Sequence, residues 1–90
     1  MRILVASNST SKRTDYFIKA GRSLGADTCF VTYDELSAVL PDCRDTVVKL
    51  EPPVFREADF RKYNLLCEEY RSLLSRLVDT DKSESVHFLN

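Results

Sequence analysis

The sequence contains little glycine and proline, with two Gly and three Pro in 90 residues. An all-β fold with many tight turns, or a low-complexity linker, would contain more of both. No stretch approaches the roughly 20 apolar residues that a membrane-spanning helix requires. The apolar run at the N-terminus covers only residues 3–6, whereas a secretory signal peptide has an apolar core of about 7–15 residues. We therefore expect a cytoplasmic protein with no membrane segment.

Cysteine and histidine are also scarce. The three cysteines, Cys29, Cys43 and Cys67, are odd in number, form no CxxC pair and lie in three different segments. A small secreted domain built on disulfides would have more cysteines and an even number of them. The single histidine, His87, is remote in sequence from every cysteine, so no zinc site is expected. We predict that the cysteines are reduced structural thiols and that the chain holds no metal.

The chain has no excess of charge of either sign, because 13 basic residues oppose 14 acidic ones. This balance excludes a strongly basic nucleic-acid-binding protein, which must neutralise many phosphates. The charges are nevertheless unevenly distributed. Residues 1–25 contain five basic side chains and one acidic one, whereas residues 26–45 contain one basic and five acidic. An anionic ligand is therefore expected nearer the N-terminal part of the chain.

What the sequence does contain is an alternation of short apolar runs with amphipathic segments. Its 43% apolar content is enough for one globular domain over residues 1–90. Continuous apolar runs predict strands that are buried on both faces. Helices are predicted where apolar residues recur at three and four, or where Thr32 and Glu35 form a capping box. The predicted strands are 2–6, 28–31, 46–50 and 86–89, and the predicted helices are 12–24, 33–40 and 57–78.

This βαβαβαβ order predicts an α/β fold, a small Rossmann-like three-layer sandwich with a four-stranded parallel sheet. Two strand orders are compatible with it. Order 3-2-1-4 places the helix over 57–78 alone on one face, whereas order 2-1-3-4 places the helix over 12–24 alone. We predict 3-2-1-4, because the longest helix is best suited to cover a face by itself. The strands at 2–6 and 28–31 should then be the most buried.

The main candidate site is the polar loop after the first strand. Doubly wound folds bind anions there, on free N–H groups of the following helix. The loop contains no glycine, so neither GxGxxG nor a Walker A motif is present and no nucleotide is expected. In the predicted order the last strand ends beside the first. A small carboxylate or phosphate ligand would then meet Ser7, Asn8, Ser9, Lys12, Arg13 and Asn90. The same loop also suits a helix cap with solvated charges, and both interpretations remain open.

Two other segments could contribute to a site. Glu51 and Arg56 flank a Pro-Pro turn after the third strand, where they could line a cleft, although such a turn more often only reverses the chain. His87 lies in the last predicted strand. No Ser or Cys nucleophile accompanies it in the same motif, so we interpret His87 as a packed or edge histidine and predict no catalytic residue in the chain.

The order of short motifs along the chain resembles a known family. The motifs are RILVA at 2–6, the Ser/Asn loop with Lys12 and Arg13, AGRSLG at 20–25, YDEL at 33–36, VKLEP at 48–52 and HFLN at 87–90. Together they resemble the N-terminal pre-ATP-grasp domain of ATP-grasp ligase-like proteins, over essentially the whole chain.

This resemblance implies a function for a larger protein. ATP-grasp enzymes use Mg-ATP to activate a carboxylate and join it to an amine or thiol, with lobes that follow the N-terminal domain. The chain would then be a non-catalytic fragment of a longer protein that packs against those lobes and helps form the substrate side of the cleft. ATP and Mg would belong to the parent protein, and this chain would hold no cofactor. The alternative is a free-standing α/β module that binds a protein or a ligand.

Overall fold

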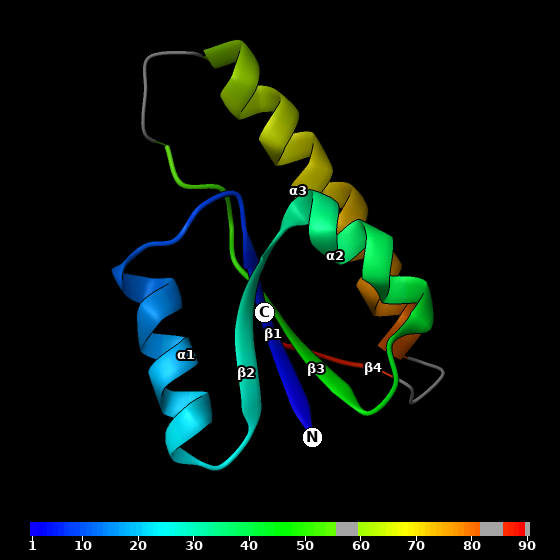
Figure 1. Cartoon of the computed structure of the whole chain (residues 1–90). Helices are drawn as coiled ribbons and strands as arrows, with labels where there is room; N and C mark the ends of the chain where they lie inside the picture. The colour runs from blue at the N-terminus through cyan, green and yellow to red at the C-terminus, as the bar shows by residue number, and fades with distance from the viewer. Residues whose placement is uncertain (56–59, 82–85, 90) are drawn as a thin grey trace.

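The structure is a computed structural model that describes residues 1–55, 60–81 and 86–89. It confirms the α/β class and the four parallel strands (Figure 1). The strands are β1 (Arg2–Ser7), β2 (Asp27–Thr32), β3 (Thr46–Leu50) and β4 (Val86–Leu89). The helices are α1 (Lys12–Ser23), α2 (Tyr33–Val39) and α3 (Phe60–Asp81), and α2 runs on into a short 3-10 turn, Leu40–Asp42.

The strand order is β2-β1-β3-β4, so the predicted order 3-2-1-4 is wrong. β3 pairs with β1, from Arg2 opposite Thr46 to Ala6 opposite Leu50. β1 and β3 are therefore the interior strands, and β2 lies at an edge. The expectation of deep burial holds for β1, whose last four residues are buried, and fails for β2, in which only Thr28 and Val31 are buried.

The prediction failed because it judged α3 by its length alone. In the observed order, right-handed crossovers place α1 alone on one face and α2 with α3 on the other (Figure 1). α3 does not cover the sheet along its whole length. Its first turns expose Phe60 by 67% and Leu65 by 60%, whereas Leu73 and Leu77 in its second half are buried. α2 therefore shares this face with the second half of α3.

The main apolar core lies between the sheet and the α2–α3 layer. Leu4 and Ala6 of β1 and Val48 and Leu50 of β3 point into it. The helices and the segment after α2 contribute Tyr33, Leu36, Leu40, Cys43, Leu73 and Leu77. Every second residue of the interior strands points to this side, so the intervening residues of β1 and β3 face α1.

Helix α1 packs closely on the other face because it has a glycine at the contact. A Cβ atom added to Gly21 would collide with the side chain of Thr28 on β2. Ser11 caps the N-terminus of α1: its hydroxyl accepts the N–H of Thr14, while the Thr14 hydroxyl accepts the N–H of Ser11. The helix is followed by Gly25 in the left-handed region, with φ 82°. This arrangement fixes the N-terminus of α1 at the carboxyl edge of the sheet.

The capping box predicted at the start of α2 is confirmed, with Thr32 accepting from the N–H of Glu35 and Glu35 accepting from the N–H of Thr32. Among the helices described, none combines the length and the apolar character that crossing a membrane would require.

Candidate functional site

The candidate site lies where β1 and β3 end side by side. The chain leaves β1 toward β2 on one side and leaves β3 toward β4 on the other, so the switch point of this sheet falls between β1 and β3. The prediction placed it between the first and last strands, and that is wrong because β3 separates β4 from β1. The loop after β1 therefore faces the segment that follows β3. Asn90, the predicted contribution of the last strand, lies outside the described residues.

Ser7 and Asn8 join these two segments. The buried Ser7 hydroxyl lies 3.2 Å from both the Pro52 carbonyl and Asn8 Oδ1. Asn8 Nδ2 donates to the Val54 carbonyl at 3.2 Å, and the Val54 N–H donates to Asn8 Oδ1 at 2.8 Å. Both predicted site residues thus fasten the loop after β1 to the loop after β3. We assign them a structural role, since their polar groups are already engaged.

Three charged side chains form the centre of the site. Glu51 follows β3 directly, and its side chain is only 6% exposed. Arg13 Nε of α1 lies 3.2 Å from Glu51 Oε1, and Lys49 Nζ of β3 lies 3.6 Å from the same oxygen. Lys49 also lies over the ring of Phe17, 5.0 Å from its centroid, in a cation–π contact. We call Arg13, Lys49 and Glu51 the switch-point cluster.

The cluster has an excess of positive charge, because two cations share one carboxylate. Glu51 Oε1 is buried and accepts no hydrogen bond within the part of the chain that the structure describes. The N-terminus of α1 adds its own partial positive charge. The Ser11 cap occupies the N–H of Thr14, whereas the N–H groups of Lys12 and Arg13 have no acceptor among the described residues. Arg13 is the accessible member, with a side chain 72% exposed.

Glu51 is also held from the opposite face of the sheet. The hydroxyl of Tyr33, at the start of α2, donates to the Glu51 carbonyl at 2.6 Å. Tyr33 is buried, and this burial raises the pKa of its hydroxyl well above the ordinary value for tyrosine. A protonated hydroxyl therefore holds the Glu51 backbone while its side chain reaches toward α1.

Of the switch-point cluster, only Arg13 is among the site residues predicted from the sequence. Lys12, also predicted, is exposed beside it at the start of α1, and Ser9 is half-buried in the loop before the helix. Glu51 was considered only with Arg56, which lies outside the described residues, and Lys49 was missed. A usable pattern existed: Lys49 interrupts an apolar strand and lies two residues before Glu51, so both face the same side of the sheet.

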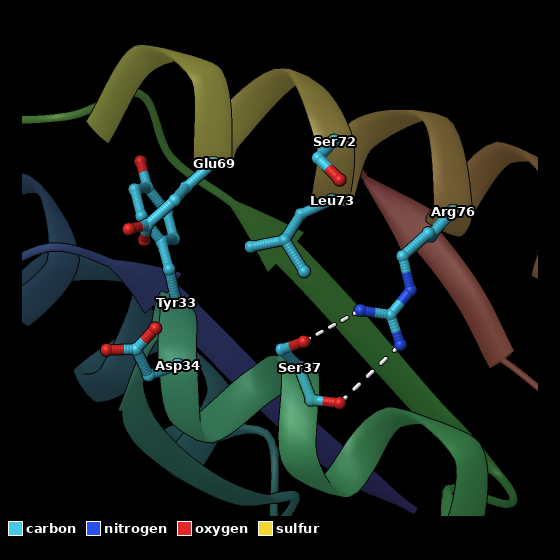
Figure 2. A pocket seen from close by; sticks show the side chains of 7 residues that line it. All are labelled: Tyr33, Asp34, Ser37, Glu69, Ser72, Leu73 and Arg76. Atoms are coloured by element: carbon cyan, nitrogen blue, oxygen red, sulfur yellow. Dashed lines mark hydrogen bonds between the residues drawn. The ribbon is translucent and has the colours of Figure 1, made fainter. Parts of the chain in front are cut away.

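Away from the switch-point cluster, a hollow lies between α2 and α3, with a volume of about 120 Å³ (Figure 2). Arg76 reaches across it from α3, donating from Nη1 to Ser37 Oγ at 2.8 Å and approaching the Ser37 carbonyl at 3.5 Å. The residue four positions after Ser37 is Pro41, which has no N–H to donate to that carbonyl. Arg76 therefore caps the end of α2. The other residues lining the hollow are Tyr33, Asp34, Glu69, Ser72 and Leu73.

Within residues 1–55, 60–81 and 86–89, no group of three or more His, Cys, Asp or Glu side chains is placed to hold a metal ion. His87 is exposed on the edge strand β4, opposite Val47. Comparisons with protein-family models, with curated proteins and with solved structures found no match to this chain. The class is therefore defined by the fold and the cluster alone: an α/β domain with an ion-paired switch point.

Proposed function

We propose that this chain is a non-catalytic α/β domain that binds a small anionic ligand at the carboxyl edge between β1 and β3. The observation that supports this proposal is the buried Glu51 carboxylate between Arg13 and Lys49. A buried ion pair contributes little to stability relative to well-packed apolar residues. Charged groups that are buried at a switch point are therefore better explained by binding than by folding.

The proposed contacts follow from the unoccupied donors of the site. Arg13 meets Glu51 through Nε, and the terminal nitrogens of its guanidinium form no hydrogen bond with the described residues, so they can form the paired bonds that suit a carboxylate or phosphate. The N–H groups of Lys12 and Arg13 point outward from the start of α1, as in other helix sites for anions. Glu51 is a positioning residue that holds the guanidinium at this edge. The cluster contains no nucleophile beside a base, so we assign no reaction to it.

A second candidate function is the one that the sequence resemblance implies, an N-terminal domain working beside the ATP-grasp lobes of a larger ligase. The observed strand order differs from the one expected with that resemblance and gives it no support. An exposed aromatic cluster at the start of α3 favours it instead. Phe55 is 52% exposed and Phe60 is 67% exposed. The centroid of the Phe55 ring lies 5.8 Å from that of Phe60 and 5.1 Å from that of Tyr63. An exposed aromatic cluster of this kind is typical of a surface that binds another protein or domain.

Amide NMR titration of the chain with sodium acetate and with sodium phosphate tests the anion site. We expect shifts at the amides of residues 12–14 and 51, with a dissociation constant on the order of millimolar, because only a few exposed polar contacts are available. Arg13→Gln should weaken this binding and reduce the shifts. The matched control is Lys19→Gln, which removes an exposed cation from the same helix away from its N-terminus. Shifts that persist unchanged in Arg13→Gln, or no shifts at all, would contradict the proposal.

The second candidate is tested by sedimentation of the chain mixed with the separately produced lobes of an ATP-grasp ligase-like protein that lacks its N-terminal domain. We expect a complex that Phe60→Ser weakens and the exposed control Leu65→Ser does not. The chain alone should bind no Mg-ATP, because residues 1–90 contain no glycine-rich phosphate loop. Equal weakening by both variants, or micromolar binding of ATP to the chain, would contradict this candidate.

A further inference from the structure

We infer that the ligand of the switch-point cluster is a small zwitterion of the free amino-acid class, with its carboxylate on Arg13 and its ammonium group on Glu51. This inference rests on the proposed anion site and adds a second contact to it. Its basis is the pair itself. A guanidinium and a carboxylate face one another at the edge of the sheet, and each is the counter-charge that one end of a zwitterion needs.

The state of Glu51 points to a missing donor. Its Oε1 atom is buried, and buried carboxylate oxygens in proteins normally accept at least one hydrogen bond. Arg13 Nε lies 3.2 Å away without forming one, and Lys49 Nζ at 3.6 Å is beyond hydrogen-bond length. The Oε1 atom therefore has positive charge beside it but lacks a hydrogen-bond donor. An ammonium group is compact and has three N–H donors, so it can supply the missing bond.

Arg13 is the side chain that can move to admit such a ligand. It is 72% exposed, and its contact with Glu51 is the only polar contact of its side chain within the described residues. Lys49, by contrast, is 13% exposed and packed against the ring of Phe17, so it stays and keeps a positive charge beside Glu51. When the ligand enters, its ammonium group replaces the guanidinium at Glu51. The guanidinium then turns to the ligand carboxylate. The Arg13–Glu51 ion pair is thereby replaced by two pairs, one between Glu51 and the ligand ammonium group and one between Arg13 and the ligand carboxylate.

The experiment compares acetate, glycine and methylammonium by amide NMR titration of the chain at neutral pH. We expect glycine to bind about tenfold more tightly than acetate, because one further charged hydrogen bond is formed. Methylammonium should bind least well to the unmodified chain, since Arg13 competes for Glu51. Arg13→Gln should weaken acetate and glycine and strengthen methylammonium, with the methylammonium shifts centred on residue 51. Lys19→Gln should leave all three unchanged.

Glu51→Gln should make glycine no better than acetate, but it also leaves Lys49 without its buried partner and so puts folding at risk. The Arg13→Gln comparison therefore decides the question, because it keeps the Lys49–Glu51 pair. If acetate causes no shifts near the start of α1, the anion site itself is wrong. If acetate binds but glycine binds equally, and Arg13→Gln gains no affinity for methylammonium, the anion site stands and the zwitterion inference is overturned.

Discussion

The two faces of the sheet are built from different residues. On the α2–α3 face, Leu36, Leu73 and Leu77 close over an apolar core. On the α1 face, the buried helix residues are Thr14 and Gly21, and the charged Lys49 and Glu51 lie beneath the start of the helix. The first face removes apolar surface from water and supplies most of the stability. The second places charged groups that stability alone does not require, which is why we assign binding to it.

The largest expected effect is on the apolar face. Leu77→Ala removes a fully buried side chain from the core and should lower the free energy of unfolding by about 2–5 kcal/mol. Leu65→Ala on the exposed side of the same helix should change it by less than about 0.5 kcal/mol. Urea unfolding followed by circular dichroism measures both. Similar costs for the two variants would show that α3 is not seated on the sheet as described.

A smaller loss is expected when the charged face is broken. Glu51→Gln leaves Lys49 in a mostly buried position without its carboxylate, which should cost about 2–3 kcal/mol in the same unfolding experiment. The double variant Lys49→Met with Glu51→Leu should recover most of that loss, since it removes the buried charges together. If Glu51→Gln is as stable as the unmodified chain, then Lys49 and Glu51 do not depend on each other, and the contrast between the faces is overstated.

The elements could be predicted from the sequence because each depends on local pattern. The apolar run at residues 2–6 and the Thr32–Glu35 capping box lie where the structure has them, and α2 ends at Val39, one residue before the predicted end. Strand order could not be predicted from local pattern, because it depends on how much of α3 reaches the sheet. The site was predicted only in part, for a related reason. Arg13 was predicted, but its approach to Glu51 depends on β1 and β3 being neighbours, which the predicted strand order did not include.

Tyr33 links the two faces, because it is buried on the α2 side and holds the backbone of Glu51. Tyr33→Phe loses this buried hydrogen bond and should cost about 1 kcal/mol at neutral pH. Burial raises the pKa of Tyr33, so folding favours its protonated form. The associated stability is present below the unfolded pKa of about 10 and is lost as pH rises above it.

The difference in free energy of unfolding between the unmodified chain and Tyr33→Phe should therefore be constant from about pH 7 to 9 and shrink above about pH 10, where Tyr33 ionises in the unfolded chain. The other tyrosines titrate in both proteins, so their contributions cancel in this difference. Urea unfolding at several pH values measures this difference. A difference that stays constant to higher pH would show that Tyr33 is as solvated in the folded chain as in the unfolded one.

The smallest expected effect concerns the contact between α2 and α3. The Ser37 carbonyl has no donor from its own helix, because Pro41 stands where that N–H would be. Arg76 supplies a donor and a positive charge at this end of α2, so Arg76→Gln should cost about 0.5–1 kcal/mol. Arg71→Gln, on the exposed side of α3, is the matched control and should change the free energy of unfolding by less.

Faster amide hydrogen exchange in residues 36–40 should accompany the loss of stability in Arg76→Gln, whereas the amides of α1 should exchange at an unchanged rate. Equal exchange in the two variants would mean that the apolar contacts of α2, without Arg76, hold this helix on the sheet.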